Sequence, residues 1–304
     1  MKECKVTVFT PTYNRAHTLT RLYLSLKNQT CFDFEWLIAD DGSTDNTSQL
    51  VDEFCEEDNP FIIRHFRQDN SDKHVAINQG VDLAKGELFF IVDSDDYLTD
   101  NAIQRIIKWE STIADINGFA GVSGNKGYEN GGLIGETFSD EYVDATSLER
   151  QKYSISGDKS EVFYTDVLRD NKFPVFEGEK FITENVVWYK IASKDLKIRW
   201  FNETIYIAEY LEDGLSRNYV QVFAKNPKGY AYSIKQSISL LHYDKKRIDS
   251  EYFNYYQIVK KNVSFRDAAR YLDIGQLALI KSIAMFYFRT AIRKLKRSNK
   301  DDSQ

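Results

Sequence analysis

The sequence predicts an α/β protein with a mostly parallel sheet flanked by helices, followed by a helical C-terminal extension. Short apolar segments recur at intervals of about thirty residues through residues 5–122, and segments of helical periodicity lie between them. Strands that alternate with helices in this way form βαβ units, whose strands run parallel. Residues 228–297 are largely helical by pattern.

The predicted strands of the sheet cover residues 5–10, 34–39, 61–66, 87–92 and 119–122. Apolar residues at helical spacing predict helices between them, as at Leu19, Leu22 and Leu26. Residues 75–85 are predicted to form a short helix that Gly86 ends. From about residue 124 the pattern indicates longer loops and antiparallel strands, and then a helix over residues 179–193 with Thr183 as its N-cap.

The strand predicted at 87–92 is the one around which a site is expected. Its five consecutive apolar residues, preceded by Gly86 and Glu87, are typical of a strand buried on both faces. Asp93, Asp95 and Asp96 follow at its end, and open α/β sheets bind ligands outside the carboxyl ends of their strands. Oxygen ligands of this kind suit Mg²⁺ or Mn²⁺. The alternative is a solvated turn that caps the next helix.

Two further strand ends carry polar residues, at 10–15 and 40–43. We expect these segments to lie beside the acidic cluster at the same edge of the sheet. No Gly-x-Gly-x-x-Gly follows the first strand, and the chain has no Gly-Lys-Ser/Thr loop. A dinucleotide-binding fold and a P-loop are therefore disfavoured.

The composition is that of an ordinary globular protein, with 42% hydrophobic and 28% charged residues among 304. Three cysteines (Cys4, Cys31 and Cys55) are an odd number, which favours reduced thiols and a cytoplasmic location. The net charge is −6, and residues 1–280, with 33 basic and 44 acidic side chains, form an acidic body that disfavours general nucleic-acid binding. We expect no signal peptide, and no apolar stretch reaches the length of about 18 residues that spans a bilayer.

The basic residues gather near the C-terminus. Residues 281–300 contain seven basic side chains and no acidic one. Residues 274–297 combine these charges with many apolar residues, which predicts an interfacial helix on an anionic membrane surface. The alternative is a helix packed on the rest of the chain with a solvated basic end.

Four motifs resemble those of family 2 glycosyltransferases of the GT-A fold, in the family's order and spacing. They are the segments 10–15, 39–45, 76–87 and 93–96, within roughly residues 5–115. Further along, residues 176–184 resemble the acceptor-side segment of bacterial members that build surface polysaccharides. The predicted organisation is accordingly a GT-A domain at 1–220, with a nucleotide-sugar half at 1–123 and an acceptor half at 124–220, followed by a helical region at 221–304.

The resemblance implies a nucleotide-diphosphate-sugar donor, expected to carry UDP, and a Mn²⁺ or Mg²⁺ cofactor. Asp41 would accept a hydrogen bond from the ring N–H of the base. Asp95 would lie near the ribose and the metal, with Asp93 or Asp96 completing the metal contact. The remaining residues expected to bind the nucleotide are Pro11, Thr12, Tyr13, Arg15 and Lys73. For Lys73 the alternative is a solvated loop lysine, and the arginine that many members carry near Ile77 is absent here.

The resemblance also implies inversion at the anomeric carbon, which needs a general base near the acceptor hydroxyl. Where many relatives carry Glu-Asp, this chain reads Glu184-Asn185. Asparagine cannot accept the proton, so Glu184 is the candidate base, with Glu177, Glu179 and Asp213 in reserve. A carboxylate that only stabilises the first turn of a helix is the alternative for Glu184.

The predicted function is transfer of a sugar to a glycan or lipid-linked acceptor in surface polysaccharide synthesis. A non-catalytic nucleotide-sugar-binding subunit is the main alternative, and Asn185 is the feature in its favour. A nucleotidyltransferase is disfavoured because residues 10–15 contain no glycine for a triphosphate loop.

Overall fold

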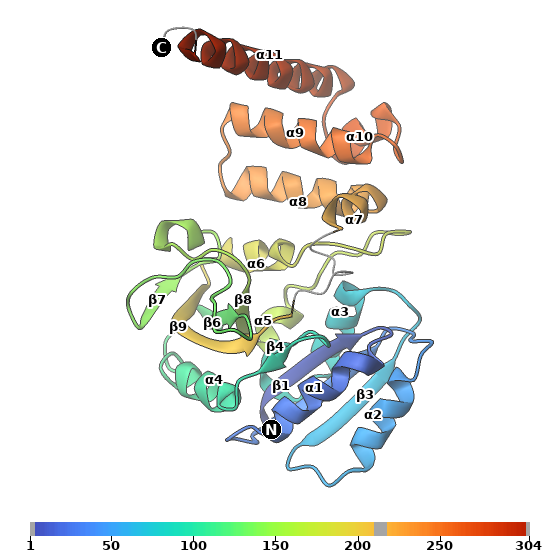
Figure 1. Ribbon diagram of the computed structural model, residues 1–304, viewed down its shortest axis with the longest axis vertical. Helices are drawn as coiled ribbons and strands as arrows, with labels where there is room; N and C mark the ends of the chain where they lie inside the picture. The colour runs from blue at the N-terminus through green and yellow to red at the C-terminus, as the bar shows by residue number, and fades with distance from the viewer. Residues whose placement is uncertain (1–3, 210–217, 302–304) are drawn as a thin grey trace. The chain divides into compact units, whose positions relative to one another are not determined.

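A computed structural model of the chain describes residues 4–209 and 218–301 (Figure 1). These residues belong to two compact units. The first is formed by Met1–Pro174 and Val187–Leu211, and the second by Val175–Val186 and Glu212–Gln304. The chain therefore enters the second unit twice, at Val175 and at Glu212, whereas one boundary at residue 220 is predicted from the sequence.

The first unit is built on one sheet with the strand order β3-β2-β1-β4-β8-β6-β9-β5, and β7 pairs with β9. The strands β1 to β4 run parallel, and β8 is antiparallel to both β4 and β6. The predicted α/β fold class with a mostly parallel sheet is thus confirmed. The strands are β1 (Cys4–Thr12), β2 (Phe34–Asp40), β3 (Ile62–Arg67), β4 (Gly86–Ile91), β5 (Tyr97–Leu98), β6 (Phe119–Gly127), β7 (Tyr142–Ala145), β8 (Lys159–Tyr164) and β9 (Lys197–Ile207).

Helices cover both faces of this sheet. On one face, the helices α1 (Ala16–Lys27), α2 (Thr47–Glu56) and α4 (Ala102–Ser111) share a single apolar core with the strands. On the other face, α3 (Lys73–Leu83) approaches so closely that a Cβ at Gly80 would lie 2.2 Å from the ring of Phe9. A larger residue at this position would displace the helix. The remaining helices of the unit are α5 (Thr165–Arg169), most of α6 (Asn185–Ala192) and a short 3₁₀ helix (Arg150–Tyr153).

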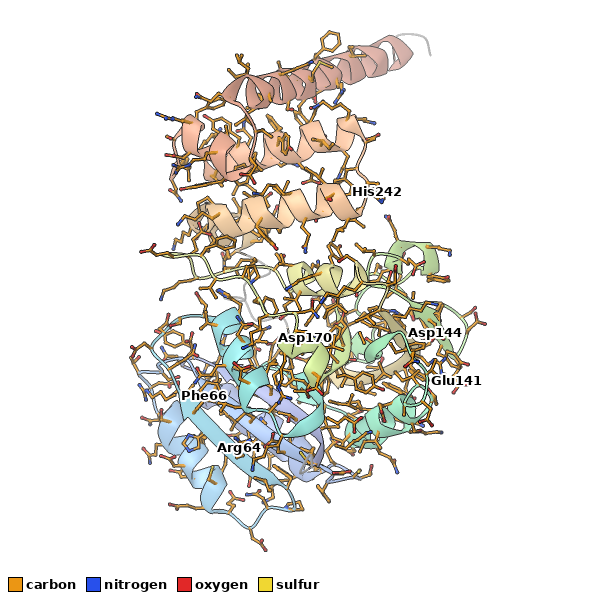
Figure 2. All side chains as sticks on the ribbon, turned by 180° about the vertical axis from the view of Figure 1, so that it is seen from behind. Arg64, Phe66, Glu141, Asp144, Asp170 and His242 are labelled. Carbon is orange, nitrogen blue, oxygen red and sulfur yellow. The ribbon has the colours of Figure 1, made fainter. Side chains whose placement is uncertain are left out.

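A buried carboxylate anchors the α3 face of the sheet. Glu35 in β2 accepts hydrogen bonds from Thr7 at 2.7 Å and from the backbone N–H of Lys85 at 2.7 Å. Arg64 on the edge strand β3, labelled in Figure 2, adds an ion pair at 2.8 Å. Because each of these partners compensates the buried charge, the neighbouring strands and the end of α3 are fixed relative to one another.

The second unit is helical, as predicted for residues 228–297. Its helices are α7 (Tyr219–Lys225), α8 (Pro227–Leu240), α9 (Lys245–Val259), α10 (Phe265–Tyr271) and α11 (Gln276–Asp301). Within the unit, α8, α9 and α11 lie in successive layers (Figure 1) around a core that includes Ala231, Tyr255 and Leu279. None of the described helices is long and apolar enough to cross a membrane.

The helix predicted over residues 179–193 is shorter than expected and begins at Asn185. The carboxylate of Glu179 accepts hydrogen bonds from the backbone N–H groups of Lys228 and Gly229, at 2.7 and 2.8 Å. It thereby satisfies two donors at the start of α8, which would otherwise lack partners. The segment that precedes Asn185 is held in an irregular conformation by these long-range bonds, which override its local helical pattern.

Candidate active site

The carboxyl ends of three parallel strands meet at one edge of the sheet in the first unit. Thr12 at the end of β1 pairs with Asp40 at the end of β2, and Phe9 in β1 pairs with Ile91 at the end of β4. The residues predicted to form the site follow these strands directly. The structure therefore brings together the segments 10–15, 40–43 and 93–96.

The loop after β1 is bound to the turn after β2. Asn14 adopts a positive φ of 54°, and its backbone N–H donates to the hydroxyl of Ser43 at 2.9 Å. Its side-chain oxygen accepts from the backbone N–H of Thr44 at 2.7 Å. These bonds hold Pro11 and Thr12 beside the second turn, while Tyr13 is 45% exposed and can contact a ligand.

Asp41 is buried in a pocket of neutral donors. One carboxylate oxygen accepts from the Gln68 side chain at 2.7 Å and from the backbone N–H of Ser71 at 2.8 Å. The other oxygen accepts from the backbone N–H of Asp72 at 2.9 Å. An ionised carboxylate can accept about four hydrogen bonds, so one acceptor position remains for a ligand donor.

Asp93 faces two lysines. The Nζ atom of Lys73, the first residue of α3, lies 2.7 Å from Oδ1 of Asp93. Burial opposes ionisation of this carboxyl, but attraction to Lys73 and then to Lys126 outweighs burial and holds its pKa below the usual value. Lys73 is therefore part of an ion pair, and the solvated loop lysine considered above is not what the structure shows.

Asp95 lies in the same turn, and burial followed by the negative charge of Asp93 raises its pKa. The guanidinium of Arg15 lies 3.7 Å from Oδ2 of Asp95, which partly offsets this repulsion. Arg21 donates to the backbone carbonyl of Asp95 and also pairs with Glu209. The site thus contains one cluster in which positive and negative side chains alternate. Its members are four of the predicted residues: Arg15, Lys73, Asp93 and Asp95.

Asp96 has a different role from its neighbours. Its Oδ2 accepts from the hydroxyl of Tyr206 at 2.6 Å, and its Oδ1 accepts from the backbone N–H of Glu209 at 2.9 Å. The same Tyr206 hydroxyl accepts from the backbone N–H of Asp93 at 3.1 Å. Burial, followed by the charge of Asp93, raises the pKa of Asp96 to about 6. These bonds tie both ends of the acidic turn to β9.

The acidic turn offers few carboxylate oxygens to a divalent cation. Among residues 4–209 and 218–301, no three His, Cys, Asp or Glu side chains form a group that could hold a metal ion by themselves. Both oxygens of Asp96 accept protein hydrogen bonds, which leaves Asp93 and Asp95 to face a cation. Mg²⁺ is commonly bound by one or two carboxylates together with substrate phosphates and water. The donor set therefore fits a cation held jointly with a diphosphate.

Glu184 belongs to the second unit, directly before α6, and is half-buried. Asn185 is the first residue of α6 and is exposed. Of the reserve candidates, Glu177 is exposed and Glu179 caps α8, whereas Asp213 lies outside the described residues.

Two residues of the cluster were not predicted from the sequence. Tyr206 is fully buried in β9, and the Nζ atom of Lys126 in β6 lies 4.0 Å from the centre of its ring. Both come from the part of the sheet after residue 118, where the family motifs are absent. The only sequence signal was a charged residue, Lys126, near the end of a strand whose other residues carry no charge.

A mostly parallel sheet with helices on both faces and acidic turns at its carboxyl edge is typical of the GT-A class of fold. Residues 7–153 match the model of the family described as Glycosyl transferase family 2. This match agrees with the resemblance of the four motifs to family 2 glycosyltransferases.

Curated bacterial relatives agree with the assignment. The chain is 35% identical over 101 residues to "Glycosyltransferase GlyG" of Streptococcus pneumoniae, covering 33% of each protein. It is 28% identical over 195 residues to the "GalNAc(5)-diNAcBac-PP-undecaprenol beta-1,3-glucosyltransferase" of Campylobacter jejuni, covering 62% of this chain and 59% of the relative. The chain thus spans less than two thirds of the length of either relative.

Solved structures share the fold. TarS of S. aureus, residues 1–349 in complex with UDP-GlcNAc, is similar with a TM-score of 0.62 and 18% identity, covering 97% of this chain and 92% of that one. The mannosyltransferase PcManGT of Pyrobaculum calidifontis, in complex with GDP-Man and Mn2+, has a TM-score of 0.58 and 16% identity, with coverages of 94% and 88%. At this level of identity the similarity establishes the fold.

Proposed function

We propose that the protein is an inverting glycosyltransferase that moves a sugar from a UDP-sugar to a glycan or lipid-linked acceptor in bacterial surface polysaccharide synthesis. The observation that carries this proposal is the meeting of two carboxylate turns at one sheet edge. Asp41 offers an acceptor position for a base N–H, and the cluster of Asp93, Asp95, Lys73 and Arg15 suits a diphosphate with its cation. The relatives support the same reading, since TarS was solved with UDP-GlcNAc and PcManGT with GDP-Man and Mn2+.

The site residues of the first unit have separate parts in holding the donor. Asp41 orients the base, and Pro11, Thr12 and Tyr13 line the nucleotide. Asp93 and Asp95 would hold Mn²⁺ or Mg²⁺, which when bound supplies Lewis-acid stabilisation of the charge on the leaving diphosphate. Lys73, Lys126 and Arg15 add positive charge to the same region, where negative charge grows in the transition state.

In the proposed reaction, Glu184 accepts the proton of the acceptor hydroxyl. The hydroxyl oxygen forms a bond to the anomeric carbon from the face opposite the diphosphate, the bond to the diphosphate oxygen breaks, and the configuration inverts. The acceptor can be lipid-linked, as the undecaprenol in the name of the C. jejuni enzyme indicates for that relative. Contact with an anionic membrane surface, where such an acceptor would be held, is part of this proposal.

Calorimetry with UDP tests the donor site. UDP should bind much more tightly with Mn²⁺ or Mg²⁺ than with a chelator, and equal affinities would refute the metal site. Thermal-shift screening of a panel of nucleotide sugars with Mn²⁺ then identifies the donor, because a ligand of the native state raises the melting temperature.

Asn185 favours a second function, a non-catalytic subunit that binds nucleotide sugars. The two proposals differ in whether donor is consumed. A transferase should slowly release free sugar from its donor when metal is present and acceptor is absent. Tight donor binding without any such release would support the non-catalytic subunit.

A further inference from the structure

Helix α11 is apolar on two faces. On one face it packs against α9, where Phe286 stacks on Phe253 with ring centres 3.9 Å apart. Leu279 on the same face is fully buried. Arg289 pairs with the buried carboxylate of Asp249 at 2.9 Å. These contacts fix the rotation of the helix about its own axis, so the residues on its opposite face are determined as well.

The opposite face carries a second apolar row, called the α11 stripe. Its residues follow one another at the helical spacing of three or four positions: Leu277, Ile280, Ala284, Phe288 and Ile292. All five are exposed, and Leu277 and Phe288 expose 82% and 61% of their surface. A helix on the surface of a globular protein normally turns a polar face to water. A continuous exposed apolar row on α11 instead marks an interaction surface.

The charges of α11 indicate what covers the stripe. Residues 276–300 contain seven basic residues and no acidic one, and six of the seven remain besides Arg289, which pairs with Asp249. Lys281 is exposed beside the stripe. A two-fold contact through α11 would place this surface against its own copy, which brings two basic helices together. An anionic bilayer instead attracts basic residues and accepts the apolar row between its head groups.

We propose that the α11 stripe binds the surface of an anionic lipid bilayer, with α11 lying in the plane of the interface. This inference extends the proposed function, because it would hold the enzyme where a lipid-linked acceptor is embedded. The apolar row supplies the burial, and the basic residues select membranes that carry negative charge.

Flotation with vesicles tests this proposal on the full chain. The wild type should float with vesicles made of equal parts of phosphatidylcholine and phosphatidylglycerol, and less with phosphatidylcholine alone or at high salt. The double variant Leu277→Glu/Phe288→Glu should bind the anionic vesicles at least about tenfold more weakly. Burial of one large apolar side chain already contributes about that factor. Both residues are exposed, so the fold should tolerate the change.

The matched control is Tyr219→Glu/Val220→Glu, which adds the same charge at two exposed apolar residues of α7 in the same unit. This control should float like the wild type. Failure of the wild type to float, or equal flotation of the stripe variant, overturns the proposal. A wild-type dimer that the stripe variant dissociates, without vesicle binding, would assign the stripe to a second copy and overturn it too. Sugar release from the donor without vesicles tests the proposed activity independently, and the stripe variant should retain it.

Discussion

The turns after β2 and β4 present carboxylates at the same sheet edge but surround them with different partners. Asp41 accepts hydrogen bonds from neutral groups, namely the Gln68 side chain and two backbone N–H groups. Asp93 and Asp95 face the cations Lys73 and Arg15. Neutral donors hold a carboxylate in one orientation toward a ligand N–H, whereas cationic side chains balance negative charge that a metal and a diphosphate can share. The turn after β2 is therefore suited to recognising a nucleotide base, and the turn after β4 is suited to balancing the charges of a cation and a diphosphate.

The largest effect is expected outside both turns, at the proposed base. Glu184→Gln keeps the shape of the side chain and removes its basicity, so turnover should fall by about 10²–10⁴-fold. Affinity for UDP with Mn²⁺ should change little, because in the proposed site the two turns bind the donor. Such a profile marks an interaction made in the transition state. Steady-state kinetics on the true acceptor, together with calorimetry, measure both quantities.

Two companion variants sharpen this test. Glu177→Gln changes a nearby exposed glutamate and should keep near-normal turnover. Asn185→Asp should raise activity if the base belongs one position later. Near-normal turnover of Glu184→Gln would contradict the assignment of the base to Glu184. A loss of turnover in Glu177→Gln would then point to Glu177, and a gain in Asn185→Asp would point to position 185.

The next largest effect is expected in the turn after β4, which contains Asp93 and Asp95. Asp95→Ala should remove most of the metal-dependent gain in UDP affinity, a loss of about 10- to 100-fold. Binding of UDP in the presence of chelator should be nearly unchanged, since the proposed contact of Asp41 with the base is kept. The exposed Asp115→Ala is the control for loss of one negative charge. If calorimetry finds the same metal dependence in Asp95→Ala as in the control, the turn after β4 does not hold the cation.

The turn after β2 is tested by its choice of base. The ring N3 of uracil donates a hydrogen bond, whereas the ring N3 of cytosine accepts one. Asp41→Asn should therefore lower the ratio of UDP to CDP affinity by about tenfold or more, which is the usual strength of a hydrogen bond to a charged group. CDP binding serves as the internal control for any disturbance of the loop. An unchanged ratio would show that Asp41 supports the loop without contacting the base.

The sheet and both turns could be predicted from the sequence because they depend on local patterns. Every residue of β2 is buried, and such strands are recognised by their apolar runs. The acidic residues follow their strands directly, and the topology of parallel sheets places them at one edge. For this reason the fold brings together five of the predicted site residues: Arg15, Asp41, Lys73, Asp93 and Asp95.

The rest of the site depends on contacts between distant segments. Tyr206 reaches Asp96 across 110 residues, and nothing in the sequence near Tyr206 distinguishes it from other aromatic residues of β9. The start of α6 was misplaced for the same reason, since Glu179 bonds to Lys228, 49 residues away. Local propensity could not reveal either contact.

The smallest expected effect concerns this long-range contact and asks whether it positions the acidic turn. Tyr206→Phe keeps the ring that packs near Phe90 and removes the hydroxyl shared by Asp93 and Asp96. The free energy of unfolding should fall by about 1–3 kcal/mol, because a buried carboxylate oxygen loses its partner. The Mn²⁺ concentration that half-saturates UDP binding should rise by up to about tenfold, as the carboxylates lose their fixed orientation.

The control is Tyr164→Phe, which removes a hydroxyl that donates to the buried Glu110 at 3.2 Å elsewhere in the same sheet. It should lower stability by a similar amount and leave the Mn²⁺ dependence unchanged. Urea unfolding and calorimetric titration separate the two quantities. If both variants shift the Mn²⁺ dependence equally, general loosening of the sheet explains the effect. If only Tyr206→Phe shifts the Mn²⁺ dependence, the Tyr206 hydroxyl holds Asp93 in the orientation that binds the cation. The neutral donors around Asp41 hold that carboxylate in place in the same way in the other turn.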